Sequence, residues 1–277
     1  MAEDVTPAPP ELLLVPTRRD RARQTSYRFR FGILYVALAA IVGAGVGTFV
    51  VLASRPAPPE AAAWSSWEPN GSKLARVRQI ADRIPKAYVQ ENGEQLTVSQ
   101  ASQLAVPTEQ GDVPITSIFV RPDTSRGLAE ESDIDAYSGA DVVSYGLCGL
   151  GTSAQCAITE GTPSSERFLL LQRQALELSL YTFKYVDGVD SVIVFMPPTP
   201  KGESNGTVFL RRDDVADELR RPLAQLLPTR APRVGALSEI ELGNILRLTK
   251  PRTYAFQFQA SSDGRPILVL TPPTAGA

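Results

Sequence analysis

The stretch GTPSSERFLLLQRQALELSLYTFKYVDG, residues 161–188, decides the fold because it predicts one long helix with very little polar surface. Thr162 is the expected N-cap, Pro163 suits the first helical position, and Gly188 is the expected stop. At about 100° per residue, the apolar side chains of this segment point in nearly every direction. We therefore expect a central helix that other elements cover on several sides.

Charged side chains form only a narrow stripe on this helix, made of Arg173, Glu177 and Lys184. Our main interpretation is that this stripe faces solvent, as charged stripes of amphipathic helices do. The alternative is that the three side chains line a cleft and contact a ligand or a partner. A concave pocket in which they converge would favour the alternative, and a convex charged surface would exclude it.

Strands follow the central helix. GVDSVIVFMPP, residues 188–198, is a continuous apolar run bounded by glycine and proline, which is typical of a buried strand. TVFLRR, residues 207–212, predicts a second strand. TYAFQFQASSDGRPILVLTPP, residues 253–273, predicts a hairpin that turns at Asp263 and Gly264.

Two further helices are expected between these strands. DDVADELRRPLAQLLP, residues 213–228, predicts a helix that an aspartate caps and that Pro222 kinks or restarts. Ser238 and Glu241 have the spacing of a capping box, so a second helix begins there and ends before Pro251.

The segment upstream of the central helix is of the same mixed kind. SKLARVRQIADRI, residues 72–84, predicts an amphipathic helix that Pro85 ends, with an apolar face made of Leu74, Val77, Ile80, Ala81 and Ile84. Three strands are expected after it, in EQLTVSQASQLAV (94–106), VPITSIFV (113–120) and DVVSYGLC (141–148). Helices and strands in this order predict an α+β fold.

Two cysteines, Cys148 and Cys156, lie just before the central helix in YGLCGLGTSAQCAI. We expect a disulfide between them, since Gly149 and Gly151 allow a tight turn and an oxidising compartment is expected for this part of the chain. A redox-active pair is the alternative, but such pairs usually have two intervening residues. No further ligands for a structural zinc site are evident.

A membrane span is expected near the N-terminus. Residues 32–53 contain no charged side chain, and about 20 apolar residues suffice to cross a bilayer. Signal peptides have shorter apolar stretches and shorter leaders, so we favour a retained anchor over cleavage near VLAS, residues 51–54. Six arginines precede the span and predict that the N-terminus is cytoplasmic and the rest of the chain extracytoplasmic.

The expected domain plan follows from this topology. Residues 1–31 form a disordered cytoplasmic tail, 32–53 the membrane helix, 54–72 a linker rich in proline and alanine, and 73–277 the extracytoplasmic α+β domain. Whether that domain is one unit or two lobes with a boundary near 146–162 stays open.

Within the membrane helix, Ala39, Gly43 and Gly47 recur every four residues and form a small-residue face. Such a face lets two membrane helices approach closely, so a homodimer or a contact with a partner helix is expected there. The alternative is that glycine and alanine are simply common in membrane helices. Trp64 and Trp67 in the linker suit either the membrane interface or packing on the outer domain.

The residue types that are missing restrict the chemistry. The chain contains no histidine, which excludes Ser-His and Cys-His nucleophile pairs and nearly all zinc sites. We therefore expect that the protein is not an enzyme and that it binds neither a metal nor a cofactor. The stretch AEESDIDAYSGAD, residues 129–141, is interpreted as a solvated acidic loop, with a cation-binding loop as the alternative. Beyond residue 53 the chain has 22 cations and 26 acids, a net charge of −4, which argues against a nucleic-acid partner.

The segment LELSLYTFKYVDGVDSVIVFM, residues 176–196, resembles the helix-and-strand ending of small sporulation and germination domains of envelope lipoproteins. This resemblance covers about 20 residues, is a common supersecondary pattern, and implies no site residue or activity here. In its topology the chain is also similar to single-pass subunits of secretion, division or conjugation machines.

Two functions from different classes are consistent with the sequence. The favoured one is a non-catalytic envelope protein, anchored in the cytoplasmic membrane, whose outer domain contacts other envelope proteins within an assembly. The alternative is a sensor or binder of an extracytoplasmic ligand, such as a cell-wall fragment or a cation. A hydrolase that uses a carboxylate pair or a Ser-Lys pair is the third interpretation. Membrane lipid is an expected partner in every case.

Overall fold

The computed structural model describes residues 18–53, 63–109, 111–122, 133–149, 156, 163–197 and 206–273. The chain divides into two units, residues 1–61 and 62–277. Each unit is described by itself below.

The first unit is built around one helix, α1, which runs from Arg18 to Ala53. Its stretch Phe29–Val50 is 22 residues long and apolar enough to cross a membrane, a property that signal sequences share. The helix ends where the expected span 32–53 ends and begins well before it. Ala39, Gly43 and Gly47 are all exposed on α1.

The second unit contains an eight-stranded mixed sheet in the order β1-β6-β7-β8-β9-β10-β4-β5 and a two-stranded sheet, β2-β3. The strands are β1 Val98–Ser102, β2 Ala105–Thr108, β3 Gly111–Pro114, β4 Ser117–Val120, β5 Asp135–Ser138, β6 Val142–Cys148, β7 Ser191–Phe195, β8 Gly206–Arg211, β9 Thr253–Ala260 and β10 Pro266–Thr271. The helices are α2 Lys73–Arg83, α3 Ser165–Tyr185 and α4 Glu239–Thr249, with single 3₁₀ turns between elements. The mixed α+β class is thus as expected.

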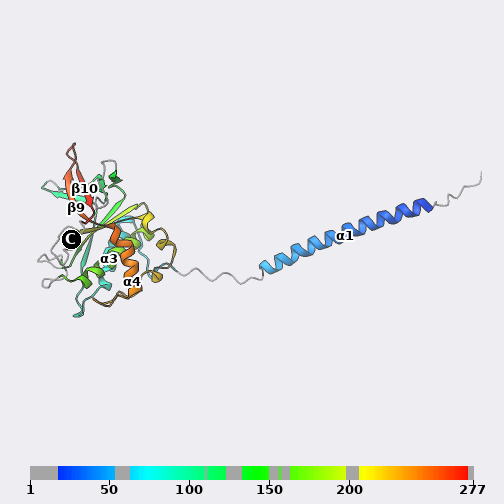
Figure 1. Cartoon of the computed structure of the whole chain (residues 1–277), viewed down its shortest axis with the longest axis horizontal. Coiled ribbons are helices and arrows are strands. Elements are labelled where there is room, and N and C mark those ends of the chain that lie inside the picture. Colours follow the sequence, from blue (N-terminus) through cyan, green and yellow to red (C-terminus); the bar gives the residue numbers. More distant parts are fainter. Residues whose placement is uncertain are drawn as a thin grey trace, which may run out of the picture. The chain divides into compact units, whose positions relative to one another are not determined.

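The central helix α3 connects two parallel neighbours, β6 and β7, in which Val143 pairs with Val192 and Tyr145 with Val194. Parallel strands need such a crossover, and the crossover places the helix on one face of the sheet. Strand β7 is almost wholly buried, which explains its continuous apolar sequence. Figure 1 shows α3 and α4 beside the sheet, with the β9–β10 hairpin at one end.

One face of the sheet and the helices form the larger core. Side chains of β6, β7 and β8 pack against α3, α2 and α4, and α3 contributes more buried side chains to this core than any other element. Two hydroxyl groups in the middle of α3 are also buried: Ser179 donates to the Ala175 carbonyl, and Thr182 donates to the Leu178 carbonyl. Because these bonds satisfy the hydroxyls within the helix, α3 can be covered on several sides.

The opposite face of the sheet forms a second, smaller core. Ile193 and Phe209 from the sheet centre pack there with residues of β4 and β10 and with Leu104 and Ile115, which flank the β2–β3 hairpin. The strands on both sides of the expected boundary at 146–162 belong to one sheet. Residues 62–277 therefore form a single compact unit and not two lobes.

Several expected elements differ from the observed ones. Residues 213–228 form three short 3₁₀ turns, η4 Arg212–Val215, η5 Glu218–Arg220 and η6 Leu223–Gln225, and not a helix. Pro222 lacks the N–H that a helix interior needs. Val215, Leu223 and Leu227 are each buried from a separate part of the segment, so its apolar residues do not form one continuous helix face.

Smaller differences affect the boundaries of elements. The N-cap of α3 is Ser164, whose Oγ accepts a hydrogen bond from the Arg167 N–H, while the expected cap Thr162 lies outside the described residues. Leu74 was expected on the buried face of α2 but is 55% exposed, because it belongs to the first turn, at the edge of the packed face. The expected strands 94–106 and 113–120 are each divided between the two sheets.

The end of the expected linker belongs to the folded unit. Trp64 is only 8% exposed and is part of the larger core, and Trp67 packs against the same core. The Leu223 N–H donates to the Trp64 carbonyl at 2.7 Å, which ties this strip to residues 222–229. The structure therefore packs both tryptophans on the core of the second unit.

Candidate functional site

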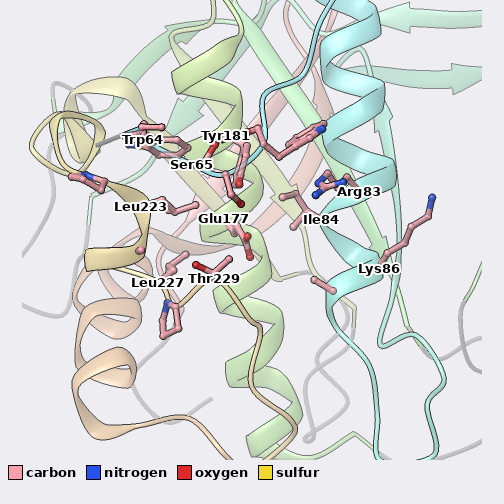
Figure 2. Close-up of a pocket in the computed structure, with 17 residues that line it drawn as sticks. Trp64, Ser65, Arg83, Ile84, Lys86, Glu177, Tyr181, Leu223, Leu227 and Thr229 are labelled. Atoms are coloured by element: carbon pink, nitrogen blue, oxygen red, sulfur yellow. Dashed lines mark hydrogen bonds between the residues drawn. The ribbon is translucent and has the colours of Figure 1, made fainter. Parts of the chain in front are cut away.

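A pocket of about 570 Å³ lies beside the central helix, inside the second unit. Four segments line it: residues 63–67, the end of α2 with the turn η1 (Pro85–Ala87), the middle of α3, and residues 222–229. In Figure 2, Glu177 and Tyr181 project from α3 toward the space between α2 and the segment that carries Leu223 and Leu227.

Aromatic side chains form one wall of the pocket. Trp64 meets Tyr181 edge to face with ring centroids 5.3 Å apart, and the Trp67 and Tyr181 centroids are 5.6 Å apart. Behind them, the Ser65 and Tyr185 hydroxyls are hydrogen-bonded at 2.7 Å. Such rings supply a large contact area that loses little conformational entropy when a ligand binds.

The Glu177 carboxylate reaches the pocket from a buried polar network. Tyr88 donates its hydroxyl hydrogen to Glu177 Oε2 at 2.5 Å, and Arg173 donates to the same oxygen at 3.0 Å. Arg173 also donates from Nε to Glu241 Oε1 at 2.6 Å and from its other amino group to the Pro228 carbonyl at 2.7 Å. The Glu177 side chain remains 14% exposed, toward the pocket that it lines.

This network holds one positive charge between two carboxylates. Burial raises the pKa of Glu177, and the attraction and hydrogen bonds from Arg173 and Tyr88 offset this effect only in part. Burial would lower the pKa of Arg173, but Tyr88, Glu177 and Glu241 together raise it above its usual value. Arg173 therefore stays protonated, and its charge is shared by Glu177 and Glu241.

Two cations lie on the side of the pocket formed by α2 and η1. Arg83 places its guanidinium carbon 4.8 Å from the centroid of the Trp67 ring, a cation–π contact, and Lys86 follows at the turn. Both side chains are exposed. In the described part of the chain neither forms an ion pair, so both remain able to contact a ligand.

The structure separates the three members of the expected stripe. Arg173 is 1% exposed, so the expectation of a solvated stripe is wrong for this residue: α4 and the chain at Pro228 cover that side of α3. Glu177 lines the pocket. Lys184 lies elsewhere, with its ammonium donating to the Leu219 carbonyl at 3.1 Å and 5.7 Å from the Trp64 ring.

Several residues of the site escaped the sequence interpretation. Glu241 has capping-box spacing, and its backbone N–H does donate to Ser238 Oγ, but its carboxylate binds Arg173. Tyr88 follows α2 and η1, and no recognisable sequence pattern marks it. Arg83 is the last residue of α2 and was not singled out from the sequence. Arg83 could be recognised as a pocket residue only from its contact with the Trp67 ring, and that contact depends on the tertiary structure.

The remaining expectations lie away from the pocket. Cys148 and Cys156 form the expected disulfide, with Cα atoms 4.7 Å apart. Of the acidic stretch 129–141, Asp135 begins strand β5, and Glu130 and Glu131 lie outside the described residues. Within the ranges that the structure describes, no group of three acidic or cysteine side chains is placed to hold a metal ion.

No family model matches this sequence, and no curated protein or solved structure is similar enough to it to count as a match. The function must therefore be argued from the site alone.

Proposed function

We propose that this protein is a single-pass protein of the cytoplasmic membrane whose extracytoplasmic domain binds a ligand, without catalysis, in the pocket beside α3. The N-terminus is cytoplasmic in this proposal, since five arginines precede the apolar stretch Phe29–Val50 and a sixth, Arg30, is its second residue. The Cys148–Cys156 disulfide supports an oxidising location for residues 62–277.

The observation that carries the binding function is the composition of the pocket. A carboxylate that is fixed by Tyr88 and Arg173 faces a space lined by three aromatic rings and two exposed cations. Ligand pockets typically have volumes of about 300–1,000 Å³ and combine apolar walls with a few fixed polar groups. Of the three residues expected to converge in a pocket, Glu177 lines this one, Arg173 lies behind Glu177, and Lys184 lies elsewhere.

A non-catalytic role is supported by how the polar groups of the pocket are engaged. A hydrolase without histidine would need an acid pair or a Ser-Lys pair within hydrogen-bond reach. Among the described residues that line the pocket, Glu177 is the one carboxylate. Ser65 donates to the Trp67 carbonyl and contacts the Tyr185 hydroxyl, while Lys86 lies on another wall.

The chain offers a direct assay for occupancy of the pocket. Its two tryptophans, Trp64 and Trp67, both line this pocket, so intrinsic tryptophan fluorescence reports on the pocket alone. The full chain in lipid nanodiscs is titrated with cell-wall fragments, short peptides, oligosaccharides and divalent cations. We expect a saturable fluorescence change with one class, lost in Tyr181→Ala and kept in Tyr137→Ala. A flat response to all four classes would contradict the proposal.

Membrane anchoring is tested separately. The full chain is expected to remain with the membrane after high-salt and alkaline washing, and a C-terminal tag is expected to be accessible from the outer face. Replacing Ala39 and Val42 together with arginine should release the chain, because each buried charge costs about 2.5–3.5 kcal/mol at the centre of a membrane helix. A protected tag would overturn the orientation, and a cleaved N-terminus would show that the segment is a signal.

A second candidate is the assembly subunit that contacts other envelope proteins. It is favoured by three phenylalanines on the sheet face: the Phe195 and Phe256 centroids are 4.7 Å apart, the Phe256 and Phe258 centroids are 5.5 Å apart, and Phe258 is 45% exposed. Mild cross-linking in native membranes followed by affinity capture tests it. Envelope proteins captured by the full chain but lost with Phe258→Ser would support it, and an empty list would remove it. Pairing through Ala39, Gly43 and Gly47 is part of this candidate, and Gly43→Ile tests it in a membrane-helix association assay.

A further inference from the structure

The pocket beside α3 carries charges of both signs on different walls. Glu177 comes from α3, whereas Arg83 ends α2 and Lys86 lies in η1. Figure 2 shows Arg83 and Lys86 on the α2 side and Glu177 projecting from α3. Charges that belong to one ion pair within the protein would neutralise one another, but none of these three pairs with another of them in the described residues.

The acidic wall has one free acceptor. Both Tyr88 and Arg173 donate to Glu177 Oε2. Within the described chain, Oε1 of the same carboxylate receives no hydrogen bond, although the side chain lines the pocket. Since Arg173 also binds Glu241, two carboxylates share one cation, and the network has an excess of negative charge. A donor with a positive charge is the complementary ligand group.

The basic wall has two donors without an acidic partner. Arg83 is held over the Trp67 ring, which fixes the direction of its guanidinium and leaves its N–H groups for an acceptor. Lys86 adds an ammonium on the next turn. Two cations without an ion pair on one wall are complementary to a carboxylate.

Between the charged walls, the pocket is apolar. The apolar and aromatic side chains that line it include Trp64, Trp67, Tyr181, Leu223, Leu227 and Ile84. An apolar or aromatic group of a ligand would gain the most binding free energy here, because these side chains would remove it from water.

Ligands of other chemistries fit only part of this arrangement. A simple cation would meet Arg83 and Lys86, and a simple anion would meet Glu177 and the excess negative charge behind it. A neutral sugar would leave Arg83 and Lys86 without an acidic partner and Oε1 of Glu177 without a charged donor. A ligand with one ammonium and one carboxylate satisfies both walls.

Building on the ligand-binding function proposed above, we infer that the pocket binds a zwitterion: an amino acid or short peptide whose free ammonium contacts Glu177, whose free carboxylate contacts Arg83 and Lys86, and whose apolar side chain lies between Trp64, Tyr181 and Leu223. The volume of about 570 Å³ accommodates either form of the ligand.

Tryptophan fluorescence of the full chain in nanodiscs tests this inference with matched probes. The probes are phenylalanine, leucyl-phenylalanine in its L,L and D,D forms, the N-acetyl form, the C-terminal amide, the doubly blocked form, and N-acetylglucosamine disaccharide. We expect one of the unblocked zwitterions to bind. Blocking either end should weaken binding by about tenfold or more, because each block removes a charge-assisted hydrogen bond.

Variants then assign each charge to its wall. Glu177→Gln should weaken binding of the zwitterion about tenfold and leave binding of the N-acetyl probe unchanged. Lys86→Gln should also weaken binding of the zwitterion about tenfold but leave binding of the C-terminal amide unchanged. Glu239→Gln and Lys250→Gln, at exposed positions on α4 and after it, are the matched controls and should change nothing. Unfolding midpoints of all variants are measured alongside, and a variant that has lost its cooperative transition is replaced by Glu177→Asp or Arg83→Gln.

The outcomes separate this inference from the function on which it rests. Equal binding of the doubly blocked peptide, or tighter binding of the disaccharide, would overturn the zwitterion and leave ligand binding intact. If no probe changes the fluorescence, the zwitterion inference is wrong. The titration with all four ligand classes then decides whether the proposed binding function is wrong as well. Selective binding of phenylalanine over the dipeptides would identify a free amino acid, and the reverse would identify a peptide.

Discussion

Arg173 on α3 and Glu241 on α4 are joined by a hydrogen-bonded ion pair in which Nε donates to Oε1 at 2.6 Å, and both side chains are buried. This pair connects the two helices behind the pocket and leaves Arg173 free to hold Glu177 with another N–H group. The orientation of the pocket carboxylate therefore depends on a contact that lies outside the pocket.

Arg173→Met is expected to destabilise the domain by about 3–5 kcal/mol, because it leaves Glu241 buried without its cation. Urea unfolding of the full chain in detergent measures the change. Arg220→Met is the matched control: Arg220 pairs with Asp217 at the surface, where both side chains are largely exposed, and no measurable loss is expected. Equal stability of Arg173→Met and the parent chain would show that the network contributes nothing.

Glu177→Gln is expected to change how stability depends on pH. Because the pKa of Glu177 is raised in the folded state, the folded chain binds more protons than the unfolded chain in the pH range between the two pKa values. The parent therefore loses stability as the pH rises from about 4.3, the value for an unfolded glutamate, through the raised value. The variant lacks this loss, so its stability relative to the parent should increase across that range.

The measurement is the free energy of unfolding of both chains at several pH values. The groups bonded to Glu177 are Arg173 on its own helix and Tyr88 after α2, with Glu241 of α4 behind Arg173. Tyr181, Arg83 and Lys86 line the same pocket, and Tyr181 interacts electrostatically with Glu177. Glu239→Gln, an exposed position on α4, should show a flat difference from the parent. A difference that runs in the opposite direction would mean that the pKa of Glu177 is lowered by folding.

Cys148→Ser is expected to destabilise the domain by about 2.5 kcal/mol, the loop-closure entropy of a nine-residue segment. In native membranes, both cysteines should resist alkylation until a reductant is added, since the extracytoplasmic side is oxidising. Mass spectrometry of alkylated peptides checks this. Alkylation without reduction would contradict both the bond and the proposed topology.

Gly139→Ala is expected to destabilise the fold by about 1–3 kcal/mol, because the added Cβ would overlap the backbone carbonyl of Ile115, whose N–H is held by the Leu104 carbonyl between β3 and β4. Gly146 on β6 has open space around the same position and serves as the control, where alanine should be neutral or slightly stabilising. Thermal unfolding of the two variants distinguishes them. Similar midpoints would show that the turn after β5 adapts easily.

Sequence patterns correctly predicted most of the elements that depend only on residues close together in the chain. The apolar run of β7, the cap at Ser238 and the turn at Gly264 were recognisable because each depends on neighbouring residues only. The segment 213–228 was mistaken for a helix because its apolar residues have helical spacing, while Pro222 and separate burial sites for Val215 and Leu223 override that spacing.

The sequence by itself determined the properties that depend on composition and short range: a helix long and apolar enough for a membrane, the absence of histidine chemistry, a mixed α+β fold and the pairing of Cys148 with Cys156. Only the tertiary structure decided that Arg173 is buried, that Trp64 and Trp67 belong to the domain, and that Glu177 meets Arg83 and Lys86 in one pocket. The physical reason is that burial and charge pairing depend on which surfaces meet. Those surfaces come from segments as far apart as residues 64, 177 and 241, whose contacts no local pattern encodes.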